Sequence, residues 1–196
     1  MATPAPPRLP DERAAAWEPA AEEAGPSVDA PGLSVRTALG VYEDRELRER
    51  VAAESGVDEP WRVLVTVRVA FDPVPGSIDG EPVRGLVHSN ARSAFVDRLR
   101  ERGFDGVRRR GRPRRRTVDG VELATFRYAA ERTVGDRRLP VEGWLAIRTR
   151  GAEYLVGGTV FPVDVGRIPD VAAVRSLFDE PDAYRDDLFS LVAAME

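Results

Sequence analysis

The sequence predicts a small α+β domain in which an antiparallel β-sheet is flanked by helices. Residues 61–71 alternate apolar and polar side chains, which is the period of a half-buried strand. The dipeptide Asp-Gly at 119–120 separates two further strand-like runs and is typical of a two-residue hairpin turn. A helical stripe recurs at four-residue spacing in Ala91, Phe95 and Leu99. Successive hairpins with amphipathic helices favour a sheet covered by helices.

The first 32 residues differ in composition from the rest of the chain. They hold seven of the 16 prolines and an Ala/Glu-rich stretch over 14–24. Such a composition buries little apolar surface, so residues 1–32 are predicted to form a flexible tail, with a turn of helix around Trp17. Residues 33–196 are predicted to form a single α+β domain.

Within residues 33–196 the apolar periodicity and the turn residues predict the order of the elements. A strand over 33–42 precedes a charged helix over 43–55, which Gly56 ends. After the strand over 61–71, Ser89 and Asn90 are candidate N-caps of a helix that runs to residue 102. The remaining elements are a hairpin over 107–118 and 121–133, a hairpin over 141–149 and 153–161, and helices over 170–178 and 181–194.

The composition excludes several classes of chemistry. The chain has no cysteine, and all 29 basic residues are arginine, so thiol and lysine mechanisms are excluded. No cofactor is predicted.

No run of about 18 apolar residues could span a bilayer, and the first ten residues lack the pattern of a secretory signal. The chain is therefore expected to be a cytoplasmic protein that does not bind membranes. Its net charge of −4 is expected to keep it soluble.

Basic charge is concentrated in residues 108–116, where seven of nine positions are arginine. Without these seven charges the formal net charge would fall from −4 to −11. Three interpretations are open: a solvated edge strand, a surface for anions or nucleic acid, and an AT-hook, because residues 110–113 match its Arg-Gly-Arg-Pro core. The candidate binding residues are Arg108, Arg109, Arg110, Arg112, Arg114, Arg115, Arg116 and Arg127.

The hairpin register supports the edge-strand interpretation. With a two-residue turn at 119–120, residues whose numbers sum to 239 face one another, so Arg112 is expected opposite Arg127. Arg114 and Arg116 are expected on the same face, opposite Thr125 and Leu123. Proline at 113 fits only an edge strand, and charged side chains on an edge block unwanted strand pairing.

Other candidate sites are weaker. His88 is the only imidazole; it is expected in a loop or near a helix N-terminus, where it could cap the helix or bind an anion, although a hydrolase that uses His88 remains an alternative. The C-terminal carboxylates lack the spacing of a calcium loop and are expected around helix starts: Asp179, Glu180, Asp182, Asp186 and Asp187. Gly157-Gly158 is expected at a bulge or a close backbone contact. Core positions are expected for Trp61, Trp144, Tyr154, Phe126 and Tyr128, the first three being also possible pocket residues.

The order of elements from residue 61 onward resembles the PsbP-like fold. The resemblance rests on the turn motif at 119–122 (Asp-Gly-Val-Glu) and on the apolar stripe of the last helix, Leu188, Phe189, Leu191 and Val192. It covers about two thirds of the chain and implies an α/β sandwich that serves as a binding or assembly accessory. The sequence is also similar to proteins of salt-adapted archaea.

Together, these observations predict a binding or assembly accessory domain without catalytic activity that acts on an unknown protein partner. The alternative is a nucleic-acid-binding protein that uses residues 108–116. A binding constant that falls steeply with salt would separate the two, because phosphate contacts release counterions.

Overall fold

The structure of the chain is a computed structural model that describes residues 4–25, 27–30, 33–76, 80–135, 137–164, 176, 178 and 181–196. The α-helices in this part of the chain are α1 (Asp11–Ala14), α2 (Arg45–Ser55), α3 (Glu81–Glu101) and α4 (Pro181–Ala194). The strands are β1 (Trp17–Ala24), β2 (Val28–Ala30), β3 (Leu33–Asp44), β4 (Val63–Asp72), β5 (Phe104–Val118), β6 (Val121–Val134), β7 (Arg137–Arg150) and β8 (Glu153–Pro162).

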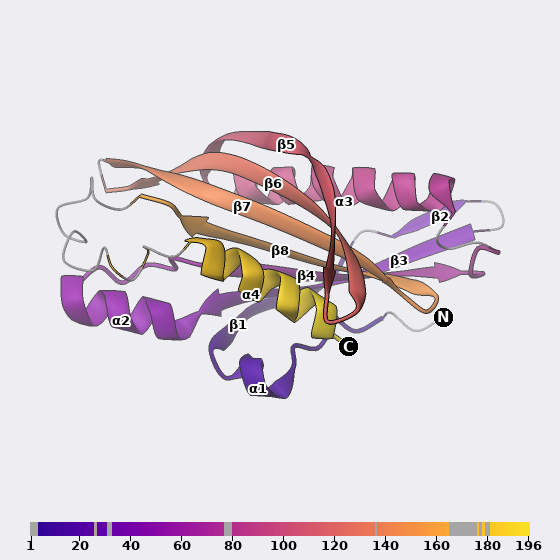
Figure 1. Ribbon diagram of the computed structural model, residues 1–196, viewed down its shortest axis with the longest axis horizontal. Coiled ribbons are helices and arrows are strands. Elements are labelled where there is room, and N and C mark those ends of the chain that lie inside the picture. Colours follow the sequence, from indigo (N-terminus) through magenta and orange to yellow (C-terminus); the bar gives the residue numbers. More distant parts are fainter. Residues whose placement is uncertain are drawn as a thin grey trace.

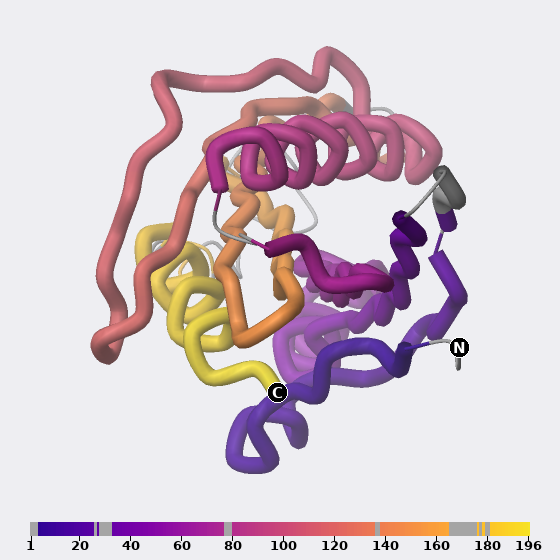
Figure 2. The backbone as a smooth tube through the Cα atoms, turned by 90° about the vertical axis from the view of Figure 1, so that its right-hand side faces the viewer, coloured from indigo at the N-terminus to yellow at the C-terminus, as the bar shows by residue number. Residues whose placement is uncertain are grey.

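The described strands form one eight-stranded sheet in the order β1-β3-β4-β8-β7-β6-β5, with β2 also paired to β3. All the pairs that these described strands form are antiparallel. Helices α3 and α4 lie on opposite faces of the sheet (Figures 1 and 2). The predicted α+β class is confirmed. We call the two sides of the sheet the α3 face and the α4 face.

Two glycines in β8 allow both helices to approach the sheet closely. A Cβ atom on Gly157 would lie 2.3 Å from Val192 of α4, and one on Gly158 would lie 2.6 Å from Phe95 of α3. Successive residues of a strand point to opposite faces, so each glycine clears the space for one helix. The close backbone contact predicted for the Gly-Gly pair is confirmed.

The prediction of a flexible tail over 1–32 is wrong for residues 4–24. Strand β1 pairs with β3, and the side chains of Leu9 and Trp17 are buried. The backbone of Arg8 exchanges hydrogen bonds of 2.7 and 3.1 Å with Glu196 at the C-terminus. This segment has few large apolar side chains, but strand β3 offers it a row of backbone donors and acceptors, and Leu9 and Trp17 anchor it.

Helix α3 begins earlier than the sequence predicts. It starts at Glu81 with Pro82 in its first turn, where a missing N–H has no helical partner to lose. Ser89 and Asn90 therefore lie within the helix and are not N-caps. The stripe that was predicted to face the sheet does so, since Phe95 and Leu99 are buried.

The other elements follow the prediction closely. Helix α4 spans Pro181–Ala194, and Gly56 ends α2 in the left-handed region with φ 73°. The expected helix over 170–178 lies largely outside the described residues. The predicted core aromatics are all buried: Trp61, Phe126, Tyr128, Trp144 and Tyr154. No helix in the described part of the chain is long and apolar enough to cross a membrane.

Candidate functional site

The arginine segment forms β5, the strand at one edge of the sheet, as the proline at 113 predicted (Figure 1). The turn to β6 contains Asp119 with φ 50° and Gly120 with φ 79°. These left-handed angles at both central residues are those of the type I′ turns that favour Asp-Gly. From Val118↔Val121 to Arg114↔Thr125, the paired residue numbers sum to 239, so the predicted register is confirmed near the turn.

Farther from the turn the predicted register is wrong. Arg110, and not Arg112, lies opposite Arg127, because the register shifts between Arg110 and Arg114. Gly111 there has φ 70°, and Pro113 cannot donate a ladder hydrogen bond. The sequence contained this signal, since glycine and proline at 111 and 113 are the residues that bulges favour.

The pairing places arginines on both faces of the edge strand. Opposite residues in an antiparallel pair share a face. Arg114 and Arg116 lie opposite residues of the α4 face, and the Arg116 guanidinium is 5.3 Å from the ring of Phe189 in α4. Arg109 and Arg115 lie opposite Tyr128 and Ala124, on the α3 face. The edge strand β5 therefore carries positive charge on both the α3 face and the α4 face of the sheet.

Most of these arginines are exposed and few have an acidic partner. We use the term arginine edge for Arg108, Arg109, Arg110, Arg112, Arg114, Arg115, Arg116 and Arg127; all but the half-buried Arg116 are exposed. Arg115 forms a 3.2 Å ion pair with Glu122, and Arg127 pairs with Glu142. An ion pair between exposed groups contributes little to stability.

Six of the eight arginines form no ion pair with a described residue: Arg108, Arg109, Arg110, Arg112, Arg114 and Arg116. Arg110, Arg112 and Arg114 are among them, and their guanidinium groups are free to form bidentate contacts with phosphate or carboxylate groups. Of the AT-hook core at 110–113, residue 110 is paired with Arg127, whereas residues 111–113 lie in the register shift and have no partner in β6.

The sequence matches the family described as Domain of unknown function (DUF6517) over residues 6–196. The chain belongs to this family. No curated protein matches the chain. The DUF6517 match includes β1 as well as the arginine edge, so the N-terminal strand is part of the family's domain.

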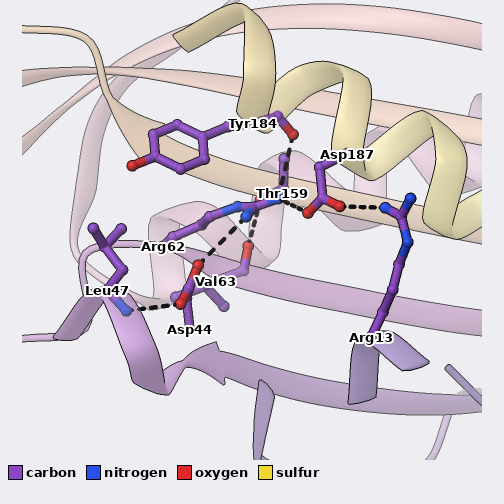
Figure 3. Close-up of polar contacts among 8 residues, drawn as sticks. All are labelled: Arg13, Asp44, Leu47, Arg62, Val63, Thr159, Tyr184 and Asp187. Carbon is purple, nitrogen blue, oxygen red and sulfur yellow. Dashed lines mark hydrogen bonds and ion pairs between the residues drawn. The ribbon is translucent and has the colours of Figure 1, made fainter. Parts of the chain in front are cut away.

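A second arginine site in this DUF6517 chain is buried and lies between β3, β4 and α4 (Figure 3). The Arg62 guanidinium contacts Asp44 at 3.4 Å and Asp187 at 2.5 Å, and donates to the carbonyl oxygen of Tyr184 at 3.3 Å. It lies 4.8 Å from the ring centres of both Trp17 and Tyr184. Cation–π contacts of this kind strengthen when water is excluded.

This network joins four separate segments of the DUF6517 domain. Asp187 of α4 also binds Arg13 of α1, at 2.5 Å. Asp44 accepts a 2.9 Å hydrogen bond from the backbone N–H of Leu47 and so caps α2. Burial raises the pKa of Asp44, and the Leu47 N–H and Arg62 oppose that rise. The network therefore has a structural role.

Sequence reasoning missed this network. The alternation over 61–71 predicts that Arg62 and Thr66 lie on the less buried face of the strand, but α4 covers that face and both residues are buried. The ion pair between residues 62 and 187 is a tertiary contact, and no local pattern in the sequence indicates it. A capping signal at Asp44, directly before a helical run, was visible in the sequence.

His88 lies in the middle of α3 and not before a helix N-terminus, so the expected loop, capping and N-terminal anion-binding positions are wrong. Its ring meets Phe126 of β6 edge-on at 5.8 Å. Burial lowers the pKa of His88, and the charges of Arg84, Arg92 and Arg115 lower it further. This environment favours the neutral imidazole at pH 7.

The predicted carboxylate cluster does not form a metal site in the described structure. Within the residues that the structure describes, no group of three or more His, Asp or Glu residues could hold a metal ion. Residues 179 and 180 lie outside this part of the chain. Asp182 and Asp186 both pair with Arg185, as expected for charges near a helix start.

Proposed function

We propose that this protein is a binding protein without catalytic activity, and that its arginine edge binds the phosphate backbone of nucleic acid. The observation that carries the proposal is the exposed edge strand with seven arginines on its two faces, six of which form no ion pair within the described structure. The resemblance to the PsbP-like fold read from the sequence supports a binding role in the same direction.

The extended backbone of β5 suits a polymer of negative charges. Successive residues of a strand are about 3.4 Å apart and point to opposite faces, so side chains on one face recur about every 6.8 Å and form a line of cations along the edge. Arginine binds phosphate through two parallel hydrogen bonds and stays charged at any physiological pH. The arginines of β5 could therefore follow a phosphate backbone over several nucleotides.

The surface gives no reason to expect sequence preference. The large hydrophobic residues exposed in the described structure are Val74, Leu86 and Val163, with no aromatic side chain on which a base could stack. Contacts to phosphate position a protein but do not read sequence. We therefore propose binding that is directed to the backbone and is similar for A·T-rich and G·C-rich duplexes.

Fluorescence anisotropy with labelled A·T-rich duplex, G·C-rich duplex and single-stranded RNA across a salt series tests the proposal. The variant Arg110→Gln/Arg112→Gln/Arg114→Gln removes three of the unpaired charges, and we expect its affinity to fall by more than about tenfold at low salt. The matched control Arg50→Gln/Arg100→Gln/Arg138→Gln removes three exposed arginines outside β5 and should bind within about twofold of the parent.

Two outcomes would contradict the proposal: no binding to any of the three probes at low salt, or an equal loss of affinity in both triple variants. The first would leave the predicted assembly role with an unknown protein partner. A clear preference for the A·T-rich duplex would instead support the AT-hook interpretation of residues 110–113.

A further inference from the structure

Helix α3 presents three basic or titratable side chains to the edge of the sheet. Arg84, His88 and Arg92 are spaced by four residues and so lie on one side of the helix. The Arg92 guanidinium lies 5.4 Å from the ring centre of Phe126, which the His88 ring also contacts. Arg92 Nε donates a 3.0 Å hydrogen bond to the His88 carbonyl oxygen. These contacts place the row directly over β6.

Strand β5 adds two more arginines to the same place. Arg109 lies opposite Tyr128, and Arg115 lies opposite Ala124. Tyr128 packs against Phe95 of α3, with ring centres 5.2 Å apart, so this side of the hairpin faces the helix. Arg109 and Arg115 therefore converge with the α3 row from the opposite side.

The hydroxyl group of Tyr128 is the unusual feature of this cluster. Tyr128 is 2% exposed, and its hydroxyl has no hydrogen-bond partner among the described residues. Burial raises the pKa of Tyr128, while the charges of Arg92 and Arg109 act against the rise. A buried donor without a partner is costly, and native structures normally satisfy it with protein, water or ligand.

The charges around that hydroxyl are also poorly compensated. Arg84 pairs with Glu81 at 3.3 Å and Arg115 with Glu122 at 3.2 Å, and both carboxylates are exposed. Arg92 and Arg109 form no ion pair with any residue that the structure describes. Positive charge on α3 and β5 thus surrounds an unused hydroxyl donor on β6.

We infer that this cluster binds a single phosphate group, with Arg92, Arg109 and the Tyr128 hydroxyl as its donors and Arg84, His88 and Arg115 around it. Arg109 is exposed and Arg92 half-buried, so rotation of these long side chains can admit an anion to the hydroxyl. The guanidinium groups neutralise the charge and form paired hydrogen bonds, and the phenol adds a third direction. The inference goes beyond the proposed function, because free phosphate could occupy the site without any nucleic acid.

His88 provides a direct test, because it is the only histidine in the chain and gives unambiguous imidazole signals in NMR spectra. We expect inorganic phosphate to shift these signals and to raise the pKa of His88, when compared with sodium chloride at equal ionic strength. A bound anion would offset the charges of Arg84, Arg92 and Arg115, which lower that pKa in the free protein.

The variant Tyr128→Phe removes only the unpartnered hydroxyl and keeps the packing of the ring. We expect it to bind phosphate about tenfold more weakly, as the loss of one hydrogen bond to a charged group predicts. Tyr42→Phe is the matched control. Tyr42 is also a buried tyrosine, but it packs with Trp17 and Leu188 on the α4 face. Removal of its hydroxyl group should leave the affinity for phosphate unchanged.

A short single-stranded oligonucleotide gives the second arm of the same titration. A shift of the His88 signals with inorganic phosphate alone would assign free phosphate as the ligand, and a shift with both probes would include the nucleic-acid backbone. Signals that move with neither probe beyond the chloride control would overturn the inference, as would a Tyr128→Phe variant that binds phosphate as tightly as the parent. The proposed function would survive that failure if the anisotropy assay still showed binding lost in the β5 triple variant.

Discussion

Arginine occurs in two opposite environments in this protein. The Arg62 guanidinium is buried among two carboxylates, a carbonyl oxygen and two aromatic rings. Arg110, Arg112 and Arg114 on β5 are exposed and form no ion pair with a described residue. Burying a charge is unfavourable unless partners compensate it, so the first environment is that of a structural residue. The second has no structural partner, which is why it is a candidate for binding.

Removing Arg62 should have the largest effect on folding. Arg62→Ala leaves Asp44 and Asp187 without their shared cation and opens a gap between Trp17 and Tyr184, so we expect a loss of about 3–5 kcal/mol in the free energy of unfolding. Urea denaturation followed by tryptophan fluorescence measures this loss. A loss below about 1 kcal/mol would show that the network does not hold these segments together.

Asp187→Asn should have a smaller effect, because the amide keeps an oxygen acceptor for Arg62 but removes the charge that Arg62 and Arg13 share. We expect a loss of about 1–2 kcal/mol, since the carboxylate is partly exposed and water screens it. Urea denaturation of Asp187→Asn beside Asp182→Asn, an exposed carboxylate on the same helix, measures the difference. Equal stability of the two variants would contradict the assigned role of Asp187.

The protonation of His88, on the α3 face, should make the stability of the fold depend on pH. Burial and the charges of Arg84, Arg92 and Arg115 hold the pKa of His88 below its usual value of about 6.5. The unfolded chain therefore takes up its proton first, so stability should fall as the pH drops from about 6.5 towards the lowered pKa of the folded state. Below that value the contribution should become constant.

Thermal unfolding of the parent and of His88→Gln between pH 5 and pH 8 isolates this contribution, because the variant retains the carboxylates that titrate at lower pH. We expect the difference in stability between the two proteins to change with pH only below about pH 6.5. A difference that stays constant over the whole range would contradict the environment assigned to His88.

The arginine edge should have the smallest effect on folding. Arg110→Gln/Arg112→Gln/Arg114→Gln should change the free energy of unfolding by no more than about 0.5 kcal/mol, because these side chains are solvated and unpaired. Urea denaturation in the same buffer as the Arg62 variant tests the contrast. A loss comparable to that of Arg62→Ala would mean that the edge arginines are structural.

Much of the fold was predictable because its signals are local. The Asp-Gly turn set the register as far as Arg114, and the apolar spacing of residues 181–194 gave the bounds of α4. The edge position of β5 followed from a single proline, since Pro113 cannot donate within a central ladder. Each of these signals acts over a few residues and needs no knowledge of the tertiary structure.

The missed features depend on contacts between distant segments. Residues 17–24 have the composition of a tail, yet they form a strand because β3 supplies hydrogen-bonding partners. The ring of Trp17 also forms a cation–π contact with Arg62. The cluster around Tyr128 joins α3, β5 and β6, and no local pattern of residues indicates that His88 faces it. Glycine and proline at 111 and 113 indicate the shift of register at 110–114. The predicted register was wrong there because it extended the pairing set by the turn past these two residues.

The central claim is that the unpaired arginines of β5 bind phosphate groups, and the salt dependence of nucleic-acid binding tests it most directly. The slope of log affinity against log salt counts the phosphates that a protein neutralises, at about 0.9 per contact on duplex DNA. We expect Arg110→Gln/Arg112→Gln/Arg114→Gln to lower the magnitude of that slope by about 3 relative to the parent, and the control Arg50→Gln/Arg100→Gln/Arg138→Gln to leave it unchanged. The same slope in the parent and in the β5 variant would contradict the claim.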